Sequence, residues 1–404
     1  MTKVISKLNN NIEYLYKQNA NTPRMALCLN FSINKADIKP GVYSLMARLL
    51  LQGTKNYNSE QLANEFEKYA IDFSSEMFHN YFRVKFVCLN EDFAKAIELM
   101  NEVITNSTFE EFEKERLKLK NEIMVDLDSP RALAMDAYCR KIFEGHYYCS
   151  SLTTILNSID SIEKEDVVEA FNYIINNSKK SLAVVGSLSK DEIDNLIIDT
   201  VGNLPDSIEG NFLIPKPELN EIKEAETIKA DLNQAHIVKG WLVPTSGDED
   251  YPALILLNII LGSCGLSSRL FTELRDKKGL AYVVRSSYET FKLAANFMIY
   301  IATEPKNIEV SLKGFDEEIE KIKTILVSEK ELADAKNNFI GRCAFSEETN
   351  LHQACQYAKN NVLGFDFNYV DSLKEKVKAV TAQQILDCAQ RCFNDKYVIS
   401  ITKP

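Results

Sequence analysis

The chain has 404 residues, of which 45% are hydrophobic and 26% are charged, as is typical of a soluble globular protein with ample material for a core. A single hydrophobic core stops growing well below this length, so we expect two domains. The formal net charge of -11 argues against nucleic acid or an anionic membrane as the main partner, because either would need a basic surface.

The ends of the chain and its cysteines indicate a compartment. No apolar run approaches the roughly 20 residues that cross a bilayer, and the N-terminal stretch MTKVISKLNNNIEYLY lacks the apolar segment of a signal peptide. The cysteines are odd in number and scattered, which suits a reducing environment, so we expect a cytoplasmic protein. Cys388 and Cys392 lie one helical turn apart, but without a second close pair or a nearby histidine we interpret them as packed thiols rather than metal ligands.

Hydrophobic periodicity predicts a series of elements in the first half of the chain. In order, we expect strands at 11–19 and 24–33, helices at 42–52 and 59–69, strands at 71–78 and 81–89, helices at 91–105, 108–129 and 163–177, and a strand at 179–189. Pro130 should end the long charged helix that precedes it, because proline lacks the amide hydrogen that helix continuation needs.

Residues 205–230 differ from what surrounds them, since they combine closely spaced prolines with charges that show no periodicity. We predict that they link an N-terminal domain, 1–204, to a C-terminal domain, 231–404. After the linker we expect a strand at 236–244, helices at 251–262 and 267–279, strands at 280–291 and 295–303, and helices at 308–324 and 328–342. Because this order repeats that of the first half, the pattern predicts a duplicated α+β unit.

The helix within 41–54, GVYSLMARLLLQGT, contains the first candidate site. Residues four apart share a helical face, so Ser44 and Arg48 should project together, with Ala47 beside them. Two histidines at that spacing, with a glutamate between them, would form half a zinc site. Serine is a poor zinc ligand, alanine cannot act as a base, and the permanent charge of arginine repels a cation, so this helix lacks the chemistry of a metal site.

Arg275 and Tyr282 form a second candidate site in ELRDKKGLAYVV, where Gly279 should end the helix so that Tyr282 begins a strand. A guanidinium and a phenol placed together could donate hydrogen bonds to a carbonyl oxygen as it gains charge. The alternative is a surface arginine in an ion pair and a strand tyrosine with a solvated hydroxyl, and spacing alone favours this alternative.

Other polar residues carry weaker signals. Glu115 and Glu122 are two turns apart and share one face of the charged helix, where a solvated surface is the default interpretation. The histidines are isolated from one another, which argues against a self-contained zinc site. Gly262 and Gly265 lack the spacing and lysine of a phosphate-binding loop, so we interpret them as a flexible entry to a helix.

Three of these stretches together resemble the pitrilysin/insulinase family of metallopeptidases, the inverzincins, whose zinc motif is H-x-x-E-H. GVYSLMARLLLQGT is similar to the family segment G-x-A-H-x-x-E-H-x-x-F-x-G-T, and KERLKLKNEIMVDLDSP is similar to the helix that supplies a third, carboxylate ligand. LGSCGLSSRLFTELRDKKGLAYVV is similar to a second-domain segment with a substrate-binding arginine and tyrosine. The resemblance implies an α+β fold of two homologous domains, each a mainly antiparallel sheet with helices packed on one face.

Position by position, the resemblance implies that Ser44 and Arg48 replace two zinc histidines and that Ala47 replaces the glutamate base. Glu122 matches the third ligand and Glu115 an accessory glutamate. We call these five residues the degenerate zinc motif. We expect Arg48 to lie near Glu122 or Glu115, where its guanidinium would neutralise the carboxylates.

Arg275 and Tyr282 match the substrate-binding pair, so the resemblance implies a subunit that is no peptidase by itself, holds no cofactor of its own, and pairs with a zinc-bearing paralogue to bind peptide. In isolation such a chain could form a homodimer. The alternative function is a structural homologue that assembles partners without any role in proteolysis.

Overall fold

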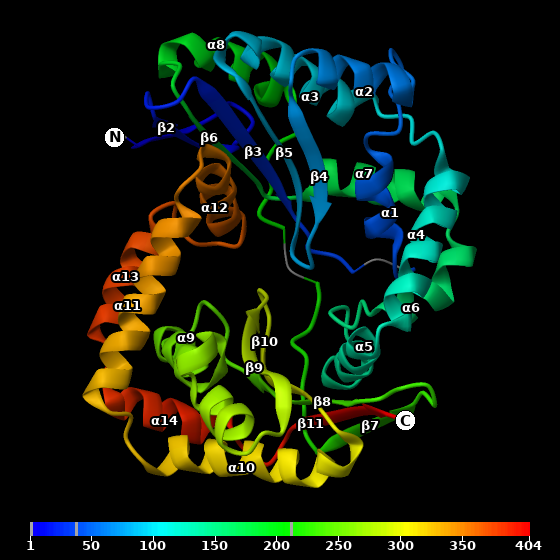
Figure 1. The fold of residues 1–404 in the computed structure, drawn as a ribbon. Helices are drawn as coiled ribbons and strands as arrows, with labels where there is room; N and C mark the ends of the chain where they lie inside the picture. Colours follow the sequence, from blue (N-terminus) through cyan, green and yellow to red (C-terminus); the bar gives the residue numbers. More distant parts are fainter. Residues whose placement is uncertain (1–2, 37–38, 211–212) are drawn as a thin grey trace. The chain divides into compact units, whose positions relative to one another are not determined.

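The computed structural model describes residues 3–36, 39–210 and 213–404 (Figure 1). Its chain forms two compact units, each of which draws on three separate segments. The first unit consists of Met1–Asn121, Ile155–Ile214 and Ala344–Tyr369, and the second of Glu122–Thr154, Pro215–Cys343 and Val370–Pro404. Residues 211 and 212 of the predicted linker lie outside the described ranges.

The first unit is built on a sheet with the strand order β1-β2-β6-β3-β5-β4. Its strands are β1 (Lys3–Lys7), β2 (Glu13–Gln18), β3 (Arg24–Ser32), β4 (Asp72–Met77), β5 (Tyr81–Leu89) and β6 (Lys180–Gly186). Only the pairing of β2 with β6 is parallel among these strands. Almost every residue of β3 is buried, which indicates that both faces of the sheet are covered at its centre.

The second unit is built on a sheet with the order β7-β11-β8-β10-β9. Its strands are β7 (Lys223–Ile228), β8 (Ala235–Val243), β9 (Ala281–Thr290), β10 (Ala295–Thr303) and β11 (Val398–Lys403). Here β7 pairs with β11 in parallel and the other pairings are antiparallel. This is the order and direction of β2-β6-β3-β5-β4 in the first unit, so the predicted duplication and the α+β fold class are confirmed.

Helices complete each unit. Those of the first unit are α1 (Val42–Leu49), α2 (Ser59–Lys68), α3 (Phe93–Asn106), α7 (Lys164–Asn177), α8 (Lys190–Thr200) and α12 (Asn350–Val362). Those of the second unit are α5 (Pro130–Ile142), α9 (Tyr251–Asn258), α10 (Ile308–Thr324) and α14 (Ala382–Cys392), with π-helical turns η4 (Ile259–Ser263) and η6 (Phe271–Lys277). Four helices contain residues of both units: α4 (Phe112–Asp128), α6 (Leu152–Ser158), α11 (Glu329–Ser346) and α13 (Tyr369–Ala379).

Two of these helices are exchanged between the halves of the sequence, and each covers a sheet face. α12 comes from the second half but packs on β3 and β6 of the first unit, as Figure 1 shows. α5 comes from the first half but packs on β8 and β11 of the second unit. The compact units therefore differ from continuous domains at 1–204 and 231–404, because each sheet buries its second face under a helix that is distant in sequence.

Local signals account for several boundaries. Asn58 and Gln61 form a capping box at the start of α2, and Ser129 caps α5, whose first residue is Pro130. Pro130 thus ends the charged helix, as predicted, and also starts the next one, because proline fits the first turn of a helix. The last part of the predicted linker is not a connector, since β7 adds an edge strand to the second sheet.

Candidate functional site

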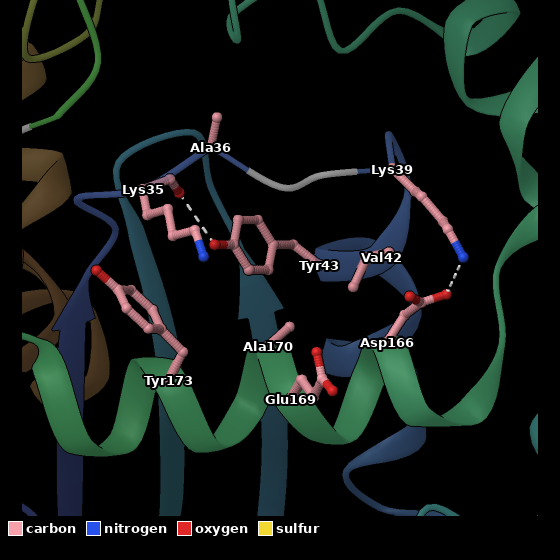
Figure 2. Close-up of a pocket in the computed structure, with 9 residues that line it drawn as sticks. All are labelled: Lys35, Ala36, Lys39, Val42, Tyr43, Asp166, Glu169, Ala170 and Tyr173. Atoms are coloured by element: carbon pink, nitrogen blue, oxygen red, sulfur yellow. Dashed lines mark hydrogen bonds and ion pairs between the residues drawn. The ribbon is translucent and has the colours of Figure 1, made fainter.

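Helix α1 of the first unit contains the start of the degenerate zinc motif, and its entry is held by polar contacts with its surroundings. Lys39 pairs with Asp166 of α7 at 2.6 Å, and the Tyr43 hydroxyl donates to the Lys35 carbonyl at 3.0 Å. Figure 2 shows these contacts at either end of a pocket between α1 and α7. They fix the helix from which Ser44 and Arg48 project.

Arg48 places a permanent positive charge in the degenerate zinc motif, where a metal site would have a neutral or negatively charged ligand. Its Nη1 lies 3.6 Å from Oε2 of Glu115, so the expected proximity of Arg48 to Glu115 or Glu122 is confirmed for Glu115. Ala47 is 6% exposed, and its carbonyl oxygen accepts a hydrogen bond from the Ser75 hydroxyl at 2.5 Å. A guanidinium beside the carboxylate does not fit a cation at this position, because it already neutralises the glutamate.

The two glutamates of the motif differ in environment. Glu115 is 4% exposed, so its default interpretation as part of a solvated face is wrong. Glu122 is exposed and belongs to the second unit. Within the described residues, no cluster of three or more histidine, cysteine, aspartate or glutamate side chains could hold a metal ion. The residues present at the motif therefore do not fit zinc.

Substitution of Arg48 tests this replacement of a metal site by an ion pair. We expect Arg48→Met to lower the free energy of unfolding by about 1–2 kcal/mol, because among the described residues the buried Glu115 carboxylate then keeps an ion pair only with the more exposed Lys118, at 3.6 Å. Urea unfolding measures the loss. As a control, the double variant Arg48→Met/Glu115→Gln should recover most of the lost free energy of unfolding. Equal losses in the single and the double variant would contradict the pairing of Arg48 with Glu115.

The second candidate site lies in the second unit, where η6 leads into β9. The Cζ atom of Arg275 lies 4.4 Å from the ring centre of Phe271 and 5.0 Å from that of Tyr282, so the guanidinium contacts both rings. Such cation–π contacts hold the arginine in one orientation and leave its donors available. Gly279, at φ 62°, ends the turn and β9 begins at Ala281, which confirms the predicted break.

The environment of Arg275 and Tyr282 agrees with one half of the alternative interpretation, since Tyr282 is an exposed strand tyrosine, and not with the other half. Within the described ranges, the Arg275 guanidinium has no carboxylate partner, so the predicted alternative of a surface ion pair is not found. Tyr282 is 77% exposed, which is unusual for so large an aromatic side chain on a strand. The structure thus brings together an unpaired cation and a solvent-facing phenol, both hydrogen-bond donors.

The serine-arginine-leucine-phenylalanine segment before Arg275 fixes the turn. The Ser268 hydroxyl donates to the Gly265 carbonyl at 2.8 Å, and Arg269 binds Glu331 of α11 through Nε at 2.9 Å and Nη2 at 3.2 Å. Although burial alone would raise the pKa of Glu331, hydrogen bonds from Arg269 and the Ser328 backbone lower it to about 2. The bidentate pair therefore persists well below neutral pH and holds the base of η6.

Gly262 in η4 supports the same strand by close packing. A Cβ atom there would lie 2.3 Å from the backbone nitrogen of Ser286 in β9, so the interpretation of Gly262 as a flexible entry is wrong: the position needs the absence of a side chain. Gly265, at φ 76°, has open space around it and supplies only the left-handed turn.

Gly262→Ala should lower the free energy of unfolding by about 1–2 kcal/mol, because η4 must move away from β9 to accommodate the methyl group. Gly341→Ala is the matched control, since Gly341 lies within α11 and an added Cβ meets nothing within 4 Å. We expect this control to be stabilised by about 0.5–1 kcal/mol. Urea unfolding of both proteins gives the comparison; similar stabilities would contradict the role assigned to Gly262.

The remaining candidate ligands have structural partners. His146 lies 2.7 Å from the Pro215 carbonyl through Nε2, and His236 lies 2.8 Å from the Tyr300 hydroxyl through Nδ1. Burial lowers the pKa of both imidazoles. The Sγ atoms of Cys388 and Cys392 are 3.9 Å apart and both residues are buried, in agreement with packed thiols.

Comparison with known proteins assigns the chain to a family. Residues 13–153 match the model of insulinase (peptidase family M16), and residues 161–339 match that of the peptidase M16 inactive domain. The chain belongs to peptidase family M16. Its residues 44, 47 and 48 are serine, alanine and arginine, none of which is a good zinc ligand.

Bacterial relatives support the assignment along most of the sequence. An uncharacterized zinc protease of Rickettsia felis is 26% identical over 90% of this chain and 88% of its own length. The probable inactive metalloprotease YmfF of Bacillus subtilis is 24% identical over 72% of this chain and 73% of its own length.

Solved structures show that the M16 fold extends over the entire chain. A peptidase M16 inactive domain from Pseudomonas fluorescens superposes with a TM-score of 0.88 at 22% identity, covering 100% of this chain and 98% of the other. A protease from Helicobacter pylori superposes with a TM-score of 0.91 at 19% identity, covering 100% of this chain and 99% of the other.

In the described part of the chain, the helices lack the length or the apolarity that a bilayer crossing demands.

Sequence reasoning missed two supporting residues of the second site. Phe271 forms the inner platform under Arg275, and Glu331 anchors the preceding arginine from α11. The four-residue spacing of Phe271 and Arg275 on one helical face could have indicated the first contact. Nothing local could have indicated Glu331, which is 62 residues from Arg269.

Proposed function

We propose that this protein is a zinc-free subunit of an M16 peptidase, which pairs with a zinc-bearing paralogue and presents Arg275 and Tyr282 to the scissile carbonyl of a bound peptide. The observation that supports this most strongly is the Arg275 guanidinium against the exposed Tyr282 ring, with no competing carboxylate among the described residues. The ion pair of Arg48 with Glu115 supports the other half of the proposal, since it replaces metal-site chemistry with a stable structural contact.

The residues of this chain would act on the substrate through hydrogen bonds. As water attacks a peptide carbonyl, negative charge develops on its oxygen, and the guanidinium and the phenol are both donors suited to that charge. Phe271 restricts the motion of Arg275, so little ordering is required when the charge forms. The zinc-bearing paralogue would activate the attacking water, so this chain would need no zinc of its own.

Reconstitution tests the proposal. The chain is mixed with a zinc-bearing M16 paralogue from the same organism, and cleavage of a quenched fluorescent peptide library is followed for each protein alone and for the mixture. We expect a stable complex and cleavage by the mixture only. A complex whose cleavage rate equals that of the paralogue alone would favour the scaffold function, and the absence of any complex would contradict the proposal.

A further inference from the structure

A pair of cysteines from opposite ends of the sequence meets inside the first unit. Cys28 lies in β3, the strand between β6 and β5, and Cys355 lies on α12, the exchanged helix that packs on this sheet. Both residues pack in one hydrophobic cluster with Leu15, Ala26 and Ala354. Cys28 is 0% exposed, whereas Cys355 is partly exposed, so only Cys355 is open to a small solute.

The surroundings of this pair are polar and positively charged, unlike those of an ordinary core thiol. The Cys28 Sγ lies 3.5 Å from Oδ1 of Asn30, to which Arg83 Nε also donates at 3.2 Å. Arg83 Nη2 further donates to the Cys355 carbonyl at 3.4 Å, and its side chain is only 9% exposed. An arginine this buried strengthens the field at the sulfur atoms, because water screens it little.

The ionisable groups that act on the thiols come from β4 and β5. They include Arg83, Lys85, Tyr81 and the carboxylate Glu76, which pairs with Lys85 at 2.5 Å and with Arg83 at 3.4 Å. On the helix that packs against them, Lys359 lies one turn from Cys355 and interacts with Arg83. Interaction with the neighbouring Cys28 thiol, followed by the charges of Arg83 and Lys85, lowers the pKa of Cys355 despite its burial. Burial raises the pKa of Cys28, so Cys355 is the more acidic thiol of the two.

We propose that Cys28 and Cys355 form a peroxide-reactive dithiol whose oxidation ties α12 covalently to the sheet of the first unit. The Cys355 thiolate attacks one oxygen of hydrogen peroxide and breaks the O–O bond; the departing hydroxide takes a proton, which leaves a sulfenic acid and one water. Cys28 then attacks the sulfenic sulfur, and its proton leaves with the hydroxyl group as a second water. The two thiols together lose two electrons, which reduce the peroxide.

Other cysteines of the chain provide internal controls. Cys388 and Cys392 are also close, at 3.9 Å, but both are buried, and the hydrogen bond with Cys392, in which Cys388 is the donor, together with burial raises the pKa of Cys388. Cys149 is partly exposed like Cys355, but burial raises its pKa. Cys388 and Cys392 thus serve as a control for two thiols that are merely close together, and Cys149 as a control for a thiol that is merely exposed. Both can be compared with Cys355 in one sample.

The test treats the reduced full-length protein with one equivalent of hydrogen peroxide at neutral pH, alkylates the remaining thiols and maps the non-reduced peptides by mass spectrometry. We expect the peptides containing Cys28 and Cys355 to be linked, while Cys388, Cys392 and Cys149 stay alkylated. In Cys28→Ala, Cys355 should be trapped as a sulfenic acid by dimedone. A Cys355 that remains reduced while Cys149 is oxidised would overturn the proposal.

Alkylation of Cys355 as a function of pH tests the assigned environment without depending on a cysteine variant. Lys85→Met should move the midpoint of the profile to higher pH, and Glu76→Gln should move it to lower pH, because they remove charges of opposite sign. Oxidation should also raise the thermal unfolding midpoint by several degrees, and dithiothreitol should reverse this change. Profiles that coincide for both variants, or an oxidised protein that unfolds like the reduced one, would contradict the proposal.

Discussion

Tyr282→Phe should lower the turnover of the reconstituted peptidase complex by about a hundredfold, or ~2.7 kcal/mol of transition-state stabilisation. The substitution removes a hydroxyl and keeps the ring on which Arg275 rests. Since the side chain is 77% exposed, the fold has little reason to change. A donor that acts only as charge develops on the carbonyl oxygen affects the chemical step more than substrate binding, so kcat should fall more than KM rises.

Tyr173→Phe serves as the matched control for this variant, because it removes a tyrosine hydroxyl from α7 of the first unit, whereas Tyr282 belongs to β9 of the second. We expect its turnover to equal that of the unmodified complex. Steady-state kinetics of the two variants, with complex formation measured separately, give the comparison. If Tyr282→Phe and Tyr173→Phe retain the same kcat, Tyr282 does not act on the scissile carbonyl.

The second large effect concerns the exchanged helix α5. A Cβ atom at Gly240 would lie 2.2 Å from the Tyr138 hydroxyl oxygen of α5 and 2.7 Å from the Phe297 carbonyl of β10. β8, which contains Gly240, is held by β10 on one side and β11 on the other, so it cannot shift to make room. We therefore expect Gly240→Ala to lower the free energy of unfolding by about 3 kcal/mol, at the upper end for overpacked cores.

Tyr138→Phe provides the companion variant. The Tyr138 hydroxyl is buried and has no hydrogen-bond partner among the described residues, and burial raises its pKa well above the usual value. Its removal should stabilise the protein by about 1 kcal/mol and reduce the loss caused by Gly240→Ala, since the closest clashing atom is gone. Thermal and urea unfolding of both single variants and the double variant measure the coupling. Additive effects would contradict the packing of α5 against β8.

Much of the fold could be predicted because its signals are local. The apolar alternation at 24–33 and 81–89, and the amphipathic stretch at 91–105, correspond to β3, β5 and α3. Repetition of this order after the linker was sufficient to predict the duplication. The exchanged helices were not predicted: α5 was missed as an element, since its apolar residues form no clear stripe, and no local pattern states on which sheet a helix packs.

Some features of the candidate sites could likewise be predicted from the sequence, and others depend on the tertiary structure. The sequence shows side chains unsuited to zinc chemistry at Ser44, Ala47 and Arg48, and the contact of Arg48 with Glu115 follows from charge once the family is recognised. The burial of Glu115 could not be predicted, because its helix is rich in charged residues and looks solvated throughout. The meeting of Cys28 with Cys355 depends on the exchange of α12, which only the tertiary structure reveals.

Metal content measured together with activity tests the central claim most directly. Zinc is quantified per chain by mass spectrometry in the isolated protein, in the paralogue and in their purified complex, and peptide cleavage is assayed in the same three samples. We predict no bound zinc and no cleavage for the isolated chain, and one zinc per heterodimer with cleavage in the complex. Stoichiometric zinc in the isolated chain, accompanied by peptide cleavage, would contradict the account.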